Sequence, residues 1–145
     1  MNIMEKEIKM GTNFYFKVKV DIKCDVPVSG KLKENILEKL KYALEDATEI
    51  HIGKRSGGWY PLFQQTEYFS SVKEIKDFYL ENKNSLSIVD EYDMEYSLEQ
   101  LDKEIFNWNK DNPEARSHLD YCSRYDGTRY YLDSEGYEFT TGEFC

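Results

Sequence analysis

The loop between residues 53 and 59 combines residue types that bind anions. Two cations, a hydroxyl and two consecutive glycines precede an aromatic ring: Lys54, Arg55, Ser56, Gly57, Gly58 and Trp59. Glycine lets a backbone approach a ligand closely, and consecutive amides can form an anion-binding nest. The loop is therefore a candidate nucleotide site, where phosphates meet the amides and cations while a base stacks on Trp59.

Two other interpretations of this loop remain open. Neither is a P-loop, because a P-loop has the order Gly-Lys-Ser/Thr followed by a helix, and both are missing here. The glycines can serve only the geometry of a tight hairpin, with Trp59 in the core. The two cations can also pair with the acidic half of the same chain.

The densest acidic cluster lies between residues 90 and 96 and includes two tyrosines. Its members are Asp90, Glu91, Tyr92, Asp93, Glu95 and Tyr96. Paired carboxylates can hold Mg²⁺ for phosphoryl transfer or divide into a general acid and a general base, so a metal-dependent nuclease is one hypothesis. Tyrosine among carboxylates is also typical of protein-binding surfaces, because tyrosine gives contact area at low entropic cost. We favour this second interpretation and predict that these six residues contact a protein partner.

Histidine and cysteine are too few for the usual catalytic and metal-binding arrangements. With only 2 histidines, no Ser-His-Asp or Cys-His order is convincing, and we predict that the protein is not an enzyme. His51 alternates with two isoleucines, so it is expected to point away from their core face as a surface or hydrogen-bonded residue. His118 and Cys122 have the spacing of two ligands on one helical face, but a closed zinc site needs four. We therefore predict no bound metal and no cofactor.

The acidic residues are unevenly distributed along the chain. Residues 84–145 hold 15 of the 28 Asp and Glu residues but only 5 of the 19 Lys and Arg residues, so the net charge of −9 arises there. Nucleic-acid binding depends on Lys and Arg, so we expect no direct nucleic-acid contact by this part. An acidic surface attracts a basic protein surface; the alternative is that these carboxylates only keep the protein soluble.

Strands are predicted where apolar residues alternate or cluster between turn signals. From residue 13 to residue 22, apolar residues such as Phe14 and Phe16 alternate with polar ones, which predicts a half-buried strand. Shorter strands are expected at 48–52, 59–65 and 85–92, and a hairpin within 129–141.

Three helices are predicted between these strands. Residues 31–46 carry leucine and isoleucine at helical spacing, and Ser71–Glu74 and Ser97–Gln100 have the form of capping boxes that begin helices. The order of elements predicts an α+β fold, with a mainly antiparallel sheet of about five to six strands and about three helices packed on one face.

The length of 145 residues fits a flexible segment, 1–12, and one α+β domain, 13–145. An aromatic fraction of 15% supplies a core. The chain begins without an apolar signal-peptide region and has no run of 18 apolar residues, so neither secretion nor a membrane span is predicted. Three widely spaced cysteines are expected to be reduced thiols in a cytoplasm.

Three short motifs resemble a widespread family of small bacteriophage proteins. They are His51–Trp59, which fits an H-[IL]-G-K-x-[SA]-x-G-W core, then Asp90-Glu91-Tyr92, then Gly142-Glu143-Phe144. The resemblance spans about residues 48–145. Members often carry a paired-cysteine segment before the core; only Cys24 lies there in this chain, so no zinc role is carried over. The resemblance implies a phage or prophage origin, and it implies no catalytic residues.

The implied phage origin and the negative charge of residues 84–145 together lead to a functional hypothesis. A small acidic phage protein without catalytic motifs is expected to act stoichiometrically on host machinery, as anti-CRISPR proteins and other anti-defence proteins do. We predict that the 90–96 segment occupies the basic nucleic-acid groove of a host defence protein in the host cytoplasm. Sequestration of a nucleotide signal at the 53–59 loop and a metal-dependent nuclease are the alternatives.

Overall fold

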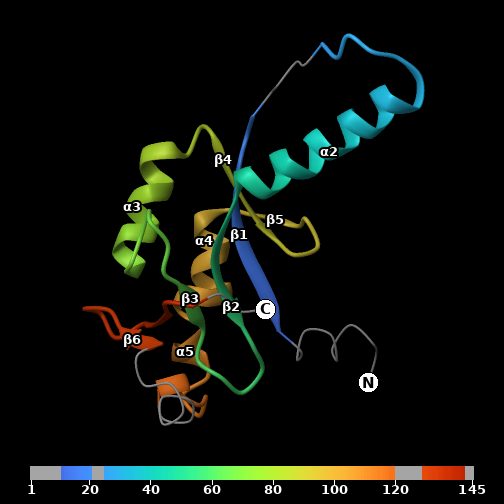
Figure 1. Ribbon diagram of the computed structural model, residues 1–145. Helices are drawn as coiled ribbons and strands as arrows, with labels where there is room; N and C mark the ends of the chain where they lie inside the picture. The colour runs from blue at the N-terminus through green and yellow to red at the C-terminus, as the bar shows by residue number, and fades with distance from the viewer. Residues whose placement is uncertain (1–10, 21–24, 120–128, 143–145) are drawn as a thin grey trace.

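The computed structural model describes residues 11–20, 25–119 and 129–142. Within them, seven strands form one sheet in the order β5-β4-β1-β2-β3-β7-β6 (Figure 1). At its centre, β1 (Thr12–Val18) pairs antiparallel with β2 (Glu49–Arg55) and with β4 (Leu86–Asp90). β5 (Glu95–Tyr96) returns beside β4 and forms one edge.

The other half of the sheet contains the C-terminal hairpin. β3 (Leu62–Gln64) follows β2 as an antiparallel hairpin, as expected. β6 (Tyr130–Leu132) and β7 (Glu138–Thr140) form the predicted tail hairpin, and β7 joins β3 in parallel. The predicted α+β class is confirmed, with seven strands in place of five to six.

The alternation in β1 separates an apolar face from a polar face. Phe14 and Phe16 are fully buried, whereas Tyr15 and Lys17, which alternate with them, are partly exposed because successive side chains of a strand point to opposite faces. The strand ends at Val18, earlier than predicted, and residues 21 and 22 of the predicted strand lie outside the described residues.

Helices cover the apolar face. α3 (Val72–Asn82) is capped at its N-terminus by Ser71, whose hydroxyl accepts a hydrogen bond from the Glu74 amide. α4 (Leu98–Leu101) begins with the predicted capping box, in which Ser97 and Gln100 bond each other's amides.

The helix predicted after Ser97 is present and consists of three consecutive pieces. α4 continues into η1 (Asp102–Phe106), a π-helical turn closed by a hydrogen bond of 2.7 Å from the Asn107 amide to the Asp102 carbonyl. A final turn, α5 (Trp108–Asp111), follows. The wider turn keeps the buried Ile105 and Phe106 facing the sheet.

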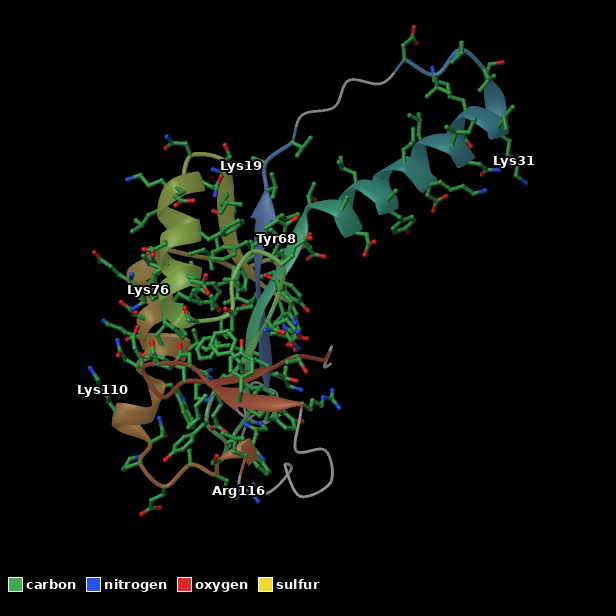
Figure 2. The ribbon with its side chains drawn as sticks, turned by 60° about the vertical axis from the view of Figure 1, so that its left-hand side comes forward. Lys19, Lys31, Tyr68, Lys76, Lys110 and Arg116 are labelled. Atoms are coloured by element: carbon green, nitrogen blue, oxygen red, sulfur yellow. The ribbon has the colours of Figure 1, made fainter. Side chains whose placement is uncertain are left out.

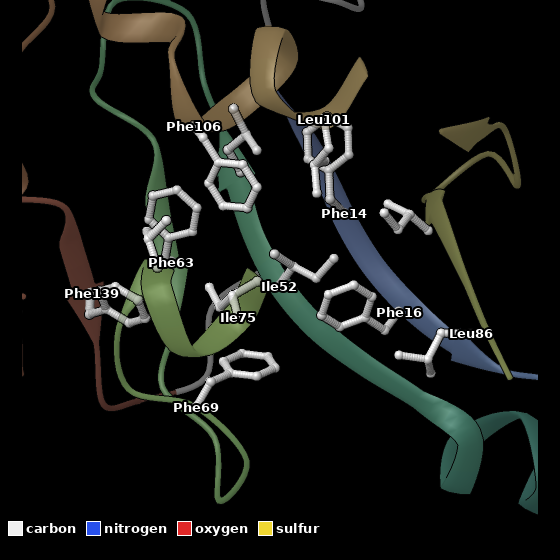
Figure 3. Packing of buried hydrophobic residues seen from close by; sticks show 13 residues of the cluster. Phe14, Phe16, Ile52, Phe63, Phe69, Ile75, Leu86, Leu101, Phe106 and Phe139 are labelled. Atoms are coloured by element: carbon white, nitrogen blue, oxygen red, sulfur yellow. The ribbon is translucent and has the colours of Figure 1, made fainter. Parts of the chain in front are cut away.

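Six phenylalanine rings and seven aliphatic side chains form the buried core between the sheet and these helices (Figure 3). Phe63 packs against two other rings, with ring centroids 5.5 Å from Phe106 and 5.4 Å from Phe139. Phe16 packs near Phe69 at 6.1 Å. Each ring buries a large apolar area, so a chain with few aliphatic residues still builds a core.

α2 (Gly30–Thr48) lies apart from this core. It projects away from the sheet, with Lys31 at its far tip (Figures 1 and 2). Of its 19 residues only Thr48 is buried, and Ile36 and Leu44 are partly buried. The helix was predicted correctly, but the expected packing on the sheet with the other helices is not observed. No helix in the described parts of the chain combines the length and apolar composition of a membrane span.

Candidate functional site

The turn between β4 and β5 is organised by Asp90. This carboxylate is buried, and its oxygens accept hydrogen bonds from the amides of Tyr92 at 2.8 Å and Met94 at 3.0 Å. The Tyr96 hydroxyl donates to the same carboxylate at 2.7 Å. Burial, and then this hydrogen bond, raise the pKa of Tyr96. Asp90 and Tyr96 therefore hold the hairpin together. The burial of Asp90 argues against the predicted contact of this residue with a partner, whereas contact by the partly exposed Tyr96 stays a prediction.

The other four predicted contact residues lie at the surface of this hairpin. Tyr92 is 64% exposed and the neighbouring Met94 is 62% exposed. The Asp93 side chain is 80% exposed, and its carboxylate lies 3.8 Å from the Lys17 ammonium. Glu95 is also exposed. We call residues 91–95 the hairpin tip.

Glu91 links the hairpin tip to the central strand. Its carboxylate accepts a hydrogen bond of 3.0 Å from the Asn13 amide at the start of β1, and its own amide donates to the Asn13 carbonyl at 3.1 Å. The Glu91 residue itself is exposed. Glu91 therefore fixes the position of the tip while contributing charge to it.

Carboxylates from the end of α2 and the start of β2 extend this acidic surface. A groove of about 170 Å³ runs beside the tip, and its lining comprises Lys17, Glu45, Glu49, Asp90, Glu91 and Asp93. Five carboxylates thus border one ammonium. The sequence analysis missed Glu45 and Glu49 because it placed the acidic surface entirely in residues 84–145. The sequence did contain one indication of these carboxylates. The last turn of α2 has no basic residue, although the helix dipole normally favours cations there.

Glu49 also lines a larger hollow of about 660 Å³. This hollow lies where β3 ends and the chain turns away from β2. β3 pairs with β2 only at Gly53 and Lys54, so it does not extend along the earlier residues of β2. Its walls include two more carboxylates, Asp46 and Glu67. The buried Gln64 amide group at this hollow donates to two carbonyls, while its oxygen has no hydrogen-bond partner. The lining is therefore rich in acceptors.

A β-bulge in β2 determines where the cations of the 53–59 loop point. One residue, Ile52, has no partner opposite it in β1, so the alternation shifts by one position. Arg55 consequently faces the helices, where its guanidinium donates to the Glu104 carboxylate at 2.7 Å and to the Glu104 carbonyl at 3.1 Å. Lys54, one residue earlier, faces the opposite side of the sheet. The two cations do not converge on one anion, and Arg55 pairs with the acidic half of the chain.

Trp59 is also engaged within the protein. The Arg116 guanidinium lies 4.3 Å from the Trp59 ring, and the His118 ring is 4.9 Å away. Gly58, at φ 79°, accepts a hydrogen bond of 2.8 Å from the Arg116 amide. The geometry favours the hairpin interpretation of this loop over a nucleotide site, because a base could stack on Trp59 only by displacing these groups.

His51 has the orientation expected from its strand. It stacks on Tyr15 with ring centroids 4.8 Å apart, and its Nε2 lies 3.0 Å from the Asn13 side-chain oxygen. Burial is the largest influence on the pKa of His51 and lowers it to about 4; a backbone hydrogen bond with Gly53 opposes this shift. His51 is a neutral, hydrogen-bonded residue at neutral pH.

Ser117, His118 and Glu138 come together in an arrangement that resembles a catalytic triad only by residue type. The Ser117 hydroxyl donates to the buried Glu138 carboxylate at 2.8 Å, and the His118 Nδ1 lies 3.9 Å from the same oxygen. A serine nucleophile needs its hydroxyl bonded to the histidine base, and here it is bonded to the acid. Among the described residues, no group of three or more His, Cys, Asp or Glu side chains could hold a metal ion. Cys122 lies outside that part of the chain, so its spacing with His118 stays a prediction.

Comparisons with protein-family models, with curated proteins and with solved structures find no match to this chain.

Proposed function

We propose that this protein acts without catalysis, by binding a basic protein surface through the hairpin tip and the adjoining end of α2. The supporting observation is the arrangement of the tip. Tyr92 and Met94, each more than 60% exposed, lie beside a groove where five carboxylates border one ammonium.

This arrangement has the parts of a protein-binding surface. Tyrosine and methionine are enriched at interfaces, and methionine adapts its shape to a partner. Carboxylates around them attract a basic partner at long range and exclude acidic ones. The neighbouring hollow, whose walls include Asp46, Glu49 and Glu67, adds carboxylates to which Lys or Arg side chains of the partner can donate hydrogen bonds.

The partner that we propose is a host nucleic-acid-binding defence protein, whose basic groove the tip would occupy as nucleic acid does. The phage origin behind this choice rests on the resemblance of the 51–59, 90–92 and 142–144 motifs to small phage proteins. Inhibition of this anti-CRISPR type needs one protein copy per target and no turnover.

The test compares two variants with the same change in charge. The tip variant combines Asp93→Asn with Glu95→Lys; asparagine is chosen because residue 93 has a φ of 62°, which asparagine tolerates. The control variant combines Asp77→Asn with Glu81→Lys, two exposed positions on α3. Each protein is immobilised and exposed to a bacterial host lysate at low and at high salt.

We expect wild type and control to retain the same protein at low salt and to release it at high salt, because exposed charges are screened. The tip variant should fail to retain it while keeping its melting temperature. Equal retention by the tip variant would refute the role of the tip.

A further inference from the structure

The hollow at the end of β3 gathers carboxylates without a lysine or arginine in its walls. Asp46 of α2, Glu49 of β2 and Glu67 of the turn after β3 all line it. None of the described residues in the walls is a lysine or an arginine. His51 also lines the hollow, but burial lowers its pKa to about 4, so it is neutral at neutral pH. The hollow therefore favours a positively charged ligand.

A buried amide in the same walls has an unmet hydrogen-bond acceptor. Gln64 is 6% exposed and lines the hollow. Its Nε2 donates to the carbonyls of Gln65 at 3.0 Å and Thr140 at 3.5 Å, which fixes the amide, while its Oε1 accepts no hydrogen bond. A buried acceptor without a donor is unfavourable. Because this oxygen is almost fully covered, only a slender donor that enters between the wall side chains can reach it, and an alkylammonium group is such a donor.

The carboxylates are spread along the hollow instead of converging on one point. Among the described residues, no group of three or more His, Cys, Asp or Glu side chains could hold a metal ion, so one compact ion does not meet all the carboxylates of this hollow. An extended ligand with several ammonium groups does. The methylene segments between its ammonium groups can contact the apolar side chains of the lining, Ala47, Ile50 and Tyr68. The Tyr68 ring is 50% exposed and can also lie against an ammonium group.

We propose that this hollow binds a linear polyamine, a small molecule in which ammonium groups alternate with short methylene chains. Its ammonium groups pair with Asp46, Glu49 and Glu67, and one of them donates to Gln64 Oε1. The volume of about 660 Å³ is typical of small-molecule sites. Figure 2 shows Tyr68 beside the end of α2 that passes into β2, with which it lines the hollow. The site goes beyond the proposed function, because it needs no protein partner.

Calorimetric titration of the full chain with spermidine, a polyamine with three ammonium groups, tests this site. We expect saturation at one spermidine per chain. Asp46→Asn combined with Glu67→Gln should raise the dissociation constant on the order of tenfold, because two ion pairs are lost. The matched control combines Asp77→Asn with Glu81→Gln, two exposed positions on α3. It makes the same change in charge and should leave the dissociation constant unchanged. Circular dichroism of each variant shows whether it folds.

Two further probes and a Gln64 variant test the chemistry of the ligand. Acetyl-lysine amide carries one ammonium group, as a lysine side chain of a partner protein does, and Mg²⁺ is a compact divalent ion. Both should bind about tenfold more weakly than spermidine or less, since neither reaches all three carboxylates. Gln64→Met keeps the carboxylates and the side-chain length but removes the amide. It should weaken spermidine binding on the order of tenfold, because a hydrogen bond from an ammonium group is lost.

The absence of saturable spermidine binding, or equal weakening by the α3 control, would overturn the proposal. An affinity for acetyl-lysine amide or Mg²⁺ equal to that for spermidine would overturn it as well, because the hollow would then recognise a single cation and not an extended one. A folded Gln64→Met protein with wild-type affinity would contradict the contact with Gln64. These titrations contain no partner protein, so their failure is distinct from a failure of the lysate experiment.

Discussion

Two histidines that are neutral in the folded protein should make its free energy of unfolding fall in mild acid. His51 and His118 each have a pKa lowered from the ordinary 6.5 to about 4, in both cases mainly by burial. The folded pKa lies below the unfolded one, so the unfolded chain binds more protons between pH 6.5 and pH 4. Stability is therefore complete above pH 6.5 and is lost as the pH falls toward 4.

The magnitude follows from the size of the shift. One pKa unit corresponds to about 1.4 kcal/mol, so each histidine should remove roughly 3 kcal/mol of unfolding free energy between pH 6.5 and pH 4. Small domains have about 5–15 kcal/mol in total. The two histidines together should therefore remove a large part of the stability of the folded protein as the pH falls to 4.

Urea unfolding at several pH values between 7.5 and 4 measures this effect. Carboxylates also titrate in this range, so the informative quantity is the difference between wild type and His51→Gln, whose amide can still donate to Asn13. His51→Gln should be less stable at pH 7.5 and should lose roughly 3 kcal/mol less on acidification. An identical pH dependence in the two proteins would show that His51 is not held neutral by burial.

Further changes test the fold around the candidate site. Gly53→Ala should cost roughly 1–3 kcal/mol, measured by urea unfolding, because its Cβ would lie 2.7 Å from the Leu62 carbonyl oxygen. Asp90→Ala should cost roughly 3 kcal/mol in the same assay, since it removes the acceptor of three hydrogen bonds; a cost near zero would mean that the turn forms without it. Phe63→Ala should cost roughly 3–5 kcal/mol, because the residue is fully buried among other rings. Lys17→Ala should change stability by less than about 0.5 kcal/mol, because its ion pair is exposed.

Local patterns allowed much of the fold to be predicted from the sequence. The alternation of β1, the Ser97–Gln100 capping box and the tail hairpin each depend on residues within a few positions of one another. The parallel pairing of β3 with β7 joins Phe63 to Phe139, 76 positions apart, and no local pattern specifies such a partner.

Two kinds of feature could not be predicted from the sequence: an inserted residue within a strand, and contacts that depend on how the chain folds. The bulge at Ile52 reverses the direction of every later side chain in β2, so the loop cations could not be assigned to one side. Asp90 resembled an exposed carboxylate of an acidic run, and only the turn geometry reveals that three donors surround it. The leucines of α2 predicted a helix correctly, but periodicity alone does not say what covers its apolar side.

The binding constant of the retained lysate protein, once purified, tests the central claim most directly. Calorimetric titration compares wild type with Asp93→Asn/Glu95→Lys and with Asp77→Asn/Glu81→Lys, two variants that have the same net charge as each other. The acidic hairpin tip predicts at least a tenfold loss, about 1.4 kcal/mol, for the first variant alone. Equal affinities for the two variants would mean that net charge, and not the tip, governs binding.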